Sequence, residues 1–563
     1  MVRNLTPPSA ASELTRLAEA EFTGEPPFSK CERLLLEKAP VGQSVDCLPD
    51  SGAQPGWDDP ANAGTWGPER SLRSRLLAWL CADRVAAKLV HWRGIRVHGA
   101  NISGPLDLEF ADVPFRLALL HCRVDSSVDL STSKVAHLDF SGSHVNDILA
   151  DGITVKYDAL FAEGFHASGG VRLRGAQIGG ILDCVGGIFF PASPAGSQEK
   201  ASALDANGII VLGDVLLREG FVANGEVDLI GAQISGDLDC SGGKFSGATD
   251  SLSAQRCVVR GSMFLRDGFK SVGNVNLANA SVGGVLAFRK GEFGGTLNLT
   301  DVSAGMYKDA GALWPTGGKL TLDGFTYGRI SNDERIDVAQ RLTWLSLQPA
   351  TTFRPQPYVQ LARILRDSGD ASGAKRVLAK MERLRRKSAN DSPVHRTWHW
   401  VPDPLGRAWN FLLRYIRRAW NWVLWLLIGY GYYPGRAGWA LVALWLIGWW
   451  LYSAGYRAGV MVPTDKQIFA EFKLWGVLPE DFPRFSASIY SLENSLPLVK
   501  FDQAAKWQPD PKPKINTTSG QGTWHRYLTL GWSLIWFLRL QIAGGWFLAT
   551  MIVAGVSGVV HKE

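Results

Sequence analysis

Aspartates recur at one place in three similar segments of this chain, where Asp107, Asp183 and Asp239 follow a leucine in LDL, LDC and LDC. A stack of carboxylates could bind a cation or transfer protons. However, the aligned position of another segment holds Ala287, and no histidine recurs beside the aspartates. We therefore interpret them as turn residues, each of which accepts a hydrogen bond from nearby backbone.

Seven cysteines could supply metal ligands, redox chemistry or disulfides, but no two of them form a CxxC pair. Their odd number and wide spacing favour reduced thiols in a cytosolic compartment over a disulfide framework. Cys184 and Cys240 occupy equivalent positions, where other segments have Leu108 and Phe288. Exchange with large apolar residues is typical of a buried small hydrophobe and not of a metal ligand.

A segment near the end of the chain, FSASIYSLENSLPLVKFDQ from Phe485, could form a short re-entrant helix that lines a channel. Its candidate functional residues are Phe485, Tyr490, Glu493, Pro497 and Lys500. No glycine follows to present backbone carbonyls to an ion, and Lys500 would repel cations. The pattern therefore favours a folded external cap, held by Trp507 and Pro509, over a pore loop.

Sequence motifs of enzymes and cofactor sites are absent. The chain has no GxGxxG between a strand and a helix, and no CxxCH, GxSxG, HExxH or P-loop. Its ten histidines form no paired constellation in the sequence. A Gly-Tyr-Gly at 429–431 resembles a potassium filter, but it precedes the first strongly apolar stretch, so we interpret it as a glycine turn. We expect no cofactor, no metal and no catalytic residue.

A repeat must position most of these residues. Five segments align without gaps, beginning at Ile95, Leu138, Val171, Val227 and Val275. Within them the local period is five, as in VRLRG-AQIGG, and the central inward positions hold Leu173, Ile178, Leu229 and Ile234. A chain that turns a corner every five residues winds into a square coil. The sequence therefore predicts a mainly β fold, a quadrilateral β-helix over 95–330, in which each interval between aligned glycines contains two or more coils.

Helices are predicted on both sides of the solenoid. A helical cap at 67–90, within an N-terminal region of 1–94, covers the first coil, since an end coil would otherwise expose its core. An amphipathic basic linker at 331–390 follows the last coil. Its helix pair around Gly369 is predicted to cap the far end of the solenoid.

Two apolar stretches predict transmembrane helices at 437–456 and 541–560. An interfacial amphipathic segment at 391–436 precedes the first, and an external loop at 457–526 separates the two. The uncharged stretch that begins the last region, 527–563, ends at Arg539, so it either lies in the interface or extends the second span. Two spans place the solenoid and the C-terminus on the same side of the membrane.

Positive charge gathers before the first span. The chain carries 59 basic and 53 acidic residues, a net charge of +6, whereas between Lys375 and Arg418 alone 12 basic and 3 acidic residues give +9. Such a block predicts the cytoplasmic side and contact with anionic lipid headgroups. The residues that we assign to this lipid-facing cluster are Arg383, Arg385, Arg386, Lys387, Arg417 and Arg418. Nucleic-acid binding is the weaker alternative, and we expect none.

The repeat over 95–330 resembles the pentapeptide-repeat family of right-handed quadrilateral β-helices, whose Ala-Asp/Asn-Leu-x-x frame it keeps in patches. Nearly the whole chain, through RLLAWLC, GANISGPLDL, PQPYVQLARILRDSG, YRAGVMVPTD and YSLENSLPLV, resembles a set of bacterial pentapeptide-like membrane proteins. Some of these are labelled membrane-associated oxidoreductases. This resemblance implies a redox cofactor, for which the sequence has no motif.

Three functions follow from the pattern. The favoured one is a non-enzymatic scaffold, in which a cytosolic solenoid face binds another protein and two helices anchor it in the inner membrane. The alternatives are an oligomeric two-helix pore gated by the solenoid and a membrane-associated oxidoreductase.

Overall fold

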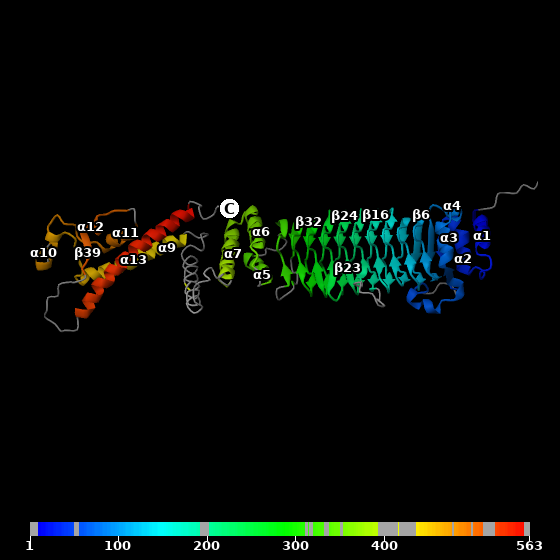
Figure 1. The fold of residues 1–563 in the computed structure, drawn as a ribbon, viewed down its shortest axis with the longest axis horizontal. Helices are drawn as coiled ribbons and strands as arrows, with labels where there is room; N and C mark the ends of the chain where they lie inside the picture. The colour runs from blue at the N-terminus through cyan, green and yellow to red at the C-terminus, as the bar shows by residue number, and fades with distance from the viewer. Residues whose placement is uncertain are drawn as a thin grey trace, which may run out of the picture. The chain divides into compact units, whose positions relative to one another are not determined.

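The computed structural model describes residues 10–49, 56–191, 202–309, 314, 319–331, 337–349, 353–391, 415, 435–475, 478–496, 499–510 and 524–556. The chain forms two compact units, Met1–Ala374 and Lys375–Glu563. The first holds stacked short strands with helices at both of its ends, and the second is mostly helical (Figure 1). The parallel β-solenoid predicted for 95–330 is confirmed, with about 9 turns.

Each central coil of the solenoid contains four short strands, whereas nearer both ends one longer strand covers two sides of a coil. One coil consists of β12 (Thr154–Val155), β13 (Ala159–Leu160), β14 (His166–Ala167) and β15 (Val171–Arg172). Each strand pairs in parallel with its counterpart in the next coil, so that His166 of β14 lies opposite Ile188 of β18 (Ile188–Phe189). The strands of the solenoid form three parallel sheets. The first begins at β1 (Val45–Asp46) and ends at β37 (Thr326–Ile330). The second begins at β2 (Ser71–Arg73) and ends at β33 (Glu292–Phe293), and the third begins at β5 (Leu106–Asp107) and ends at β36 (Leu320–Thr321).

Two corners of each coil carry a residue in the left-handed conformation. One column of such corners contains Gly99, His121 and Gly142, and the other contains Gly152, Gly175 and Gly231. Gly142 and Gly175 thus stand at different corners, one and a half coils apart. The expectation of two or more whole coils in every interval is wrong there. Both corners need the same backbone geometry, so they have similar local sequences that a gap-free alignment cannot distinguish.

Apolar side chains fill the solenoid. The predicted inward residues Leu173, Ile178, Leu229 and Ile234 are all buried. A column of phenylalanines runs through successive coils with ring centroids 5.1–5.4 Å apart, and its members are Phe165, Phe189, Phe221, Phe245, Phe269 and Phe293. Coils contact only their neighbours in such a stack, so each ring stabilises the coil above and the coil below.

The recurring aspartates close turns, as predicted. The carboxylates of Asp107, Asp183 and Asp239 each accept a hydrogen bond from the backbone N–H two residues later, at 3.1, 2.9 and 3.0 Å. Each lies three residues before a left-handed corner, at Phe110, Gly186 and Gly242. Their role is therefore structural, because these oxygens satisfy the backbone where the chain turns. They are not stacked on one another, since Asp107 belongs to a different sheet and Leu216 stands between Asp183 and Asp239.

The cysteines divide into two groups. Cys184 and Cys240 are buried as predicted, and burial raises the pKa of both thiols well above the ordinary value. Cys31 and Cys47, in contrast, form a disulfide across 16 residues, so the expectation of seven free thiols is wrong for this pair. The folded N-terminal region brings the two together, whereas their spacing in the sequence gave no sign of it.

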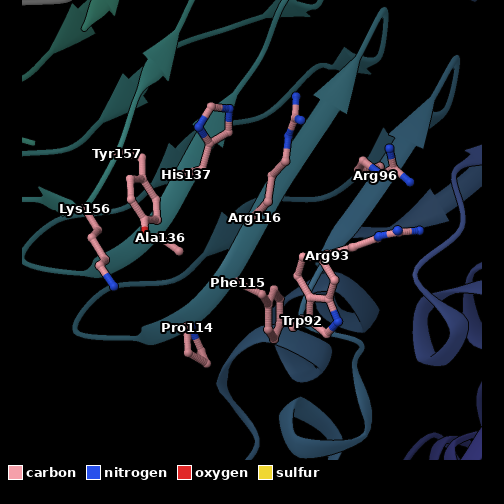
Figure 2. A pocket seen from close by; sticks show the side chains of 10 residues that line it. All are labelled: Trp92, Arg93, Arg96, Pro114, Phe115, Arg116, Ala136, His137, Lys156 and Tyr157. Atoms are coloured by element: carbon pink, nitrogen blue, oxygen red, sulfur yellow. The ribbon is translucent and has the colours of Figure 1, made fainter. Parts of the chain in front are cut away.

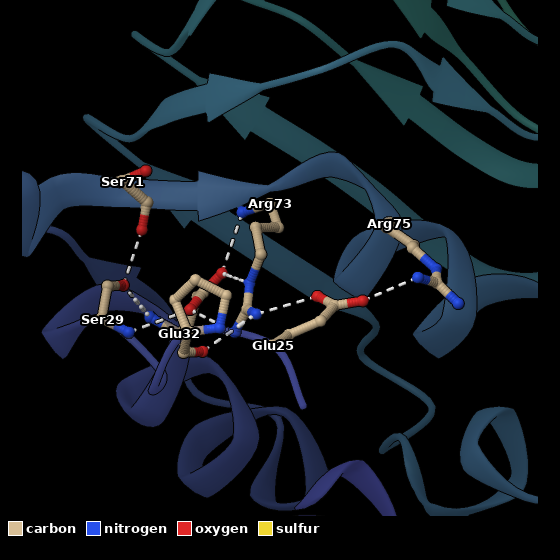
Figure 3. Close-up of polar contacts among 7 residues, drawn as sticks. Glu25, Ser29, Glu32, Ser71, Arg73 and Arg75 are labelled. Carbon is tan, nitrogen blue, oxygen red and sulfur yellow. Dashed lines mark hydrogen bonds and ion pairs between the residues drawn. The ribbon is translucent and has the colours of Figure 1, made fainter. Parts of the chain in front are cut away.

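Four helices cover the first coil, namely α1 (Ala10–Glu21), α2 (Lys30–Lys38), α3 (Ser74–Ala82) and α4 (Ala86–Leu89). Polar contacts fasten α2 to strand β2 (Figure 3). The carboxylate of Glu32 accepts hydrogen bonds from the backbone N–H of Arg73 at 2.9 Å and from its Nε at 2.7 Å. Glu25 bridges Arg73 and Arg75, and Ser29 donates to the carbonyl of Ser71. The predicted N-terminal cap is therefore larger than 67–90.

Helices α5 (Val338–Leu345) and α6 (Gln356–Asp367) close the far end of the solenoid. Glutamines of α6 pair with the last coil: the amide of Gln356 accepts from the N–H of Gly324 and donates to the carbonyl of Phe325, and Gln360 donates to the carbonyl of Tyr327 at 2.7 Å. An end coil has no following coil to satisfy such backbone groups, so these side chains take its place. Helix α7 (Ala371–Asp391) follows Gly369, as predicted.

The second unit contains two helices that are long and apolar enough to cross a membrane, by length and composition. They are α9 (Gly435–Arg457) and residues Leu530–Val553 of α13 (Trp524–Val556), each with a mean hydropathy of 1.4. The segment that joins them contains α10 (Lys466–Trp475), α11 (Ala487–Ser495), α12 (Gln503–Lys506) and the antiparallel pair β38 (Met461–Pro463) and β39 (Trp507–Pro509).

The second apolar helix differs from the prediction of 541–560. Helix α13 packs against α9, with Leu548 beside Ala437 and Leu534 beside Gly455. The residues of α13 that pack along the uncharged part of α9 therefore extend from about Leu534 to Leu548. This stretch begins before residue 541 and includes Arg539. Arg539 does not end the helix, so the extended-span alternative agrees with the structure and a separate interfacial segment does not.

Candidate functional site

The short helix α11 enters the space between the two apolar helices. The hydroxyl of Ser491 donates to the carbonyl of Trp445 in α9 at 2.8 Å. The side-chain amide of Gln541 in α13 donates to the hydroxyls of Ser491 and Ser495, at 2.9 and 2.8 Å. These partners lie near the middle of α9 and of the apolar part of α13. A helix that comes from the connecting segment and reaches this depth follows the re-entrant course that the sequence offered as the less favoured alternative to an external cap.

Glycines make this approach possible. A Cβ atom at Gly448 would collide with the hydroxyl of Ser491, and one at Gly545 with the carbonyl of Ser495. The hydroxyl of Tyr452 donates to the other atom of the Gln541 amide, its Oε1, at 2.7 Å. The polar groups of the three helices thus satisfy one another, which stabilises helix contacts where no water is available.

The candidate loop residues have mainly structural contacts. Phe485 packs on Trp507 with ring centroids 5.2 Å apart and on Tyr490 at 5.5 Å. Glu493 accepts a hydrogen bond from the backbone N–H of Ala504 at 2.9 Å, which holds the chain that returns from α11. Lys500 is exposed, and Pro497 lies outside the described residues. Trp507, predicted to pin the external cap, is fully buried in β39.

The sequence prediction missed Gln541 and the serine pair of α11. A polar residue at the centre of an apolar helix was the available signal, since such a residue usually faces the protein interior. Glycines near Gln541 did predict a close helix approach, and Gly545 confirms it. The partner of Gln541 could not be read from the sequence, because it depends on how deeply α11 enters.

Helix α7 carries the described part of the lipid-facing basic cluster. Arg383, Arg385 and Lys387 are exposed, whereas Arg386 is half-buried and bonds to Glu382 at 2.6 Å. Arg417, Arg418 and the 429–431 tripeptide lie outside the described residues. The exposed side chains are on one amphipathic helix, an arrangement that suits contact with a charged surface.

A pocket opens on the side of the solenoid near its N-terminal end, with a volume of ≈ 480 Å³ (Figure 2). Arg96, Arg116 and His137 come from the paired strands β3 (Ile95–His98), β6 (Asp112–Leu120) and β9 (Lys134–Asp139). Trp92, Arg93, Phe115, Lys156 and Tyr157 complete most of the wall. We call this site, defined by these eight residues, the basic aromatic pocket.

Charge in this pocket is mostly positive. Arg116 is paired with Asp139, and Arg96 donates to the carbonyl of Gly42 at 3.0 Å. In the part of the chain that the structure describes, Arg93 and Lys156 have no acidic partner and lie over the neighbouring aromatic rings. Burial, and then the charge of Arg116, lowers the pKa of His137.

Aromatic rings in the same pocket are unusually open, since Trp92 is 75% exposed and Tyr157 is 53% exposed. A cavity that combines cations with exposed rings can bind an anionic group and an apolar or planar group together. The sequence prediction missed this site because its residues come from four successive coils and a preceding loop.

The structure also brings together histidines that the sequence scattered. His98 and His121, 23 residues apart, meet at adjacent corners with ring centroids 5.2 Å apart, and Asp58 lies beside both. The expectation that no histidines form a paired group is wrong here. The signal was a spacing of one coil, which the five-residue period alone did not give.

Comparisons of this chain with protein-family models, with curated proteins and with solved structures found no match.

Proposed function

We propose that this protein is a membrane-anchored, non-enzymatic scaffold that holds an acidic partner protein at the cytoplasmic membrane. The basic aromatic pocket carries this proposal. Helices close both ends of the solenoid, so its sides are the surfaces left for binding. The two apolar helices supply the anchor.

The chemistry of the pocket defines the partner. Arg93 and Lys156 offer two cations without acidic partners among the described residues, and Trp92 and Tyr157 offer exposed rings. An Asp/Glu-rich segment that also carries an aromatic or aliphatic side chain would satisfy both. We infer that such a segment lies across β3, β6 and β9.

Membrane contact is the second part of the proposal. The exposed arginines and lysine of α7 would lie against anionic headgroups, with the solenoid and both termini on the cytoplasmic side. The Cys31–Cys47 disulfide is the observation that opposes this side, because disulfides persist mainly in oxidising compartments. Counting thiols in cells, described below, distinguishes the two orientations.

Site-specific photocrosslinking in cells tests the scaffold. A photoreactive amino acid at position 157 of the full-length protein should give a discrete protein adduct, and Arg93→Glu with Lys156→Glu should abolish it. Leu212, which is 62% exposed elsewhere on the solenoid, is the matched control position, and Lys244→Glu is the control charge reversal. Adducts that form equally from position 212, or that consist of lipid or RNA, would overturn the proposal.

An oligomeric two-helix pore is the second candidate function, and two observations favour it. Helix α11 reaches the middle of the apolar helices, as a pore helix does. Arg539 is exposed on α13 at the same apolar depth, where a charge usually faces water or another protein chain. However, the polar side chains of α11 bond within this chain, which leaves few of them for a pore lining.

Native mass spectrometry in mild detergent separates the two candidates. A ring of four or more copies whose ion flux changes with Arg539→Gln would favour the pore. A monomer or dimer with no flux would leave the scaffold.

A further inference from the structure

Three polar side chains meet where the N-terminal region touches the first coils. Asp58 comes from the loop before the 3₁₀ helix η2 (Pro60–Thr65), His98 ends β3, and His121 stands at the corner of the next coil. We propose that Asp58, His98 and His121 together bind one divalent transition-metal ion of the Zn²⁺ type.

Distances among the three fit a common ion. The Oδ2 atom of Asp58 lies 3.0 Å from Nε2 of His98 and 3.7 Å from Nδ1 of His121, and the ligand atoms all lie within 4.8 Å of one another. Ligand atoms around a tetrahedral zinc ion, with bonds of about 2.0–2.1 Å, stand about 3.3 Å apart. Small side-chain rotations would therefore complete the geometry.

Neighbouring residues hold the histidines in place. The second ring nitrogen of His98, Nδ1, lies 3.6 Å from Oδ1 of Asp46, which is the carboxylate–histidine arrangement common behind metal ligands. The ring of His121 lies over Gly142, where a Cβ atom would come within 2.7 Å of Nε2. A glycine at this corner therefore leaves the space that the imidazole occupies.

The loop that carries Asp58 is fixed as well. Arg70 is buried and donates to the carbonyl of Trp57 at 2.8 Å and to the carbonyl of Gly99 at 2.9 Å. The ring of Trp57 also lies 5.1 Å from that of His98. These contacts join the loop to the first coil, so Asp58 is presented to the histidines by a supported backbone.

Ligand chemistry selects the class of ion. Two imidazole nitrogens and one carboxylate oxygen suit zinc and similar ions, whereas calcium and magnesium prefer oxygen ligands alone. The negative charges of Asp46 and Asp58 balance a divalent ion. The side chains of the three ligands keep some exposure to solvent, 26% for Asp58, 25% for His98 and 35% for His121. Water can therefore reach the site and occupy the fourth coordination position of the ion. A bound ion would fasten the loop to the first two coils.

Metal binding by the full-length protein in mild detergent tests this proposal. After treatment with a chelator, titration with Zn²⁺ followed by calorimetry should show one equivalent bound and a higher melting temperature. We expect His98→Ala and His121→Ala each to weaken the affinity at least tenfold. Co²⁺ should give the absorption bands of a four-coordinate site, and Asp58→Asn, which keeps the shape of the side chain, should abolish them.

Two nearby histidines provide the control. His144 and His166 stack on each other with centroids 5.0 Å apart but belong to no group of three ligands among the described residues. His144→Ala and His166→Ala should leave the affinity unchanged. Failure of the unaltered protein to bind zinc would overturn the proposal, as would equal zinc binding by the Asp58→Asn, His98→Ala and His121→Ala variants.

Discussion

The solenoid and the second unit, which we call the membrane unit because we propose that its apolar helices cross a membrane, differ at their centres. Apolar side chains fill most of the solenoid interior, whereas the contact between α11 and the two apolar helices also buries a group of uncharged polar side chains. In the solenoid, phenylalanines such as Phe221 and Phe245 are fully buried. In the membrane unit, Ser491, Ser495 and Gln541 are fully buried, whereas Trp439 is 76% exposed. Water drives the first arrangement, because it favours the burial of apolar surface. In the membrane that we propose for the second, lipid would give no such drive, so close packing and hydrogen bonds would hold the helices together.

One chain can therefore contain two units with different sources of stability. Loss of apolar volume should damage the solenoid most. Loss of a hydrogen-bonding group should damage the membrane unit most.

The largest effect is expected in the solenoid core. Phe221→Ala removes a ring that contacts Phe189 and Phe245, and the cavity it leaves should cost about 3–5 kcal/mol. Denaturant unfolding followed by far-UV circular dichroism measures this loss. Leu212→Ala, at an exposed position on the same solenoid, should change the free energy of unfolding little. Equal effects of the two substitutions would contradict the buried phenylalanine column.

A smaller effect is expected in the membrane unit. Gln541→Leu leaves the hydroxyls of Tyr452, Ser491 and Ser495 without this partner, and the loss should be about 1–2 kcal/mol. Unfolding in mixed micelles with rising SDS measures it. Thr550→Val, on the exposed side of the same helix, is the matched control. If Gln541→Leu stabilised the unit, apolar burial would govern both units and the comparison would fail.

Thiol counting tests which side of the membrane the solenoid unit faces. Denatured without reductant, protein isolated in air should show five reactive thiols, because Cys31 and Cys47 are joined. In cells quenched with acid we expect seven, because the cytoplasm keeps thiols reduced. A mass tag on each reactive thiol gives the count. Five in quenched cells would place the solenoid in an oxidising compartment and reverse the proposed topology.

The smallest expected effect is a loss of folding stability at acidic pH. Burial, and then the charges of His166 and Arg123, lowers the pKa of His144 to about 4 from its ordinary 6.5. The unfolded chain therefore binds a proton here before the folded chain does, and stability falls as the pH drops from about 6.5 towards 4. At pH 5.5 this loss should stay below about 1 kcal/mol, since the ring is partly solvated.

Urea midpoints at pH 7.5 and 5.5 measure this effect. His144→Asn should lose less stability than the unaltered protein between these two values. An equal loss in both proteins would show that other groups cause the acid sensitivity.

Much of the fold was predictable from the sequence, because its signals are local. A five-residue period with glycine at the corners reports backbone geometry directly, and the inward positions of Leu173 and Leu229 followed from it. The two apolar helices were predictable in the same way, because an uncharged stretch of about 20 residues is a local feature of the sequence. The alignment failed between Gly142 and Gly175, where two different corners share one local conformation.

The candidate sites were less predictable, because contacts across coils and helices create them. Local patterns in the sequence were enough to predict the solenoid, helices at its two ends and the two apolar helices, but not the course of α11 between them. Only the tertiary structure decided that Cys31 meets Cys47, that Gln541 meets Ser491, and that Asp58 meets His98 and His121. Contacts between coils depend on the register in which the coils stack, and the contact of Gln541 with Ser491 depends on how deeply α11 enters between the apolar helices. No short stretch of residues sets either quantity, so neither contact could be predicted from local patterns.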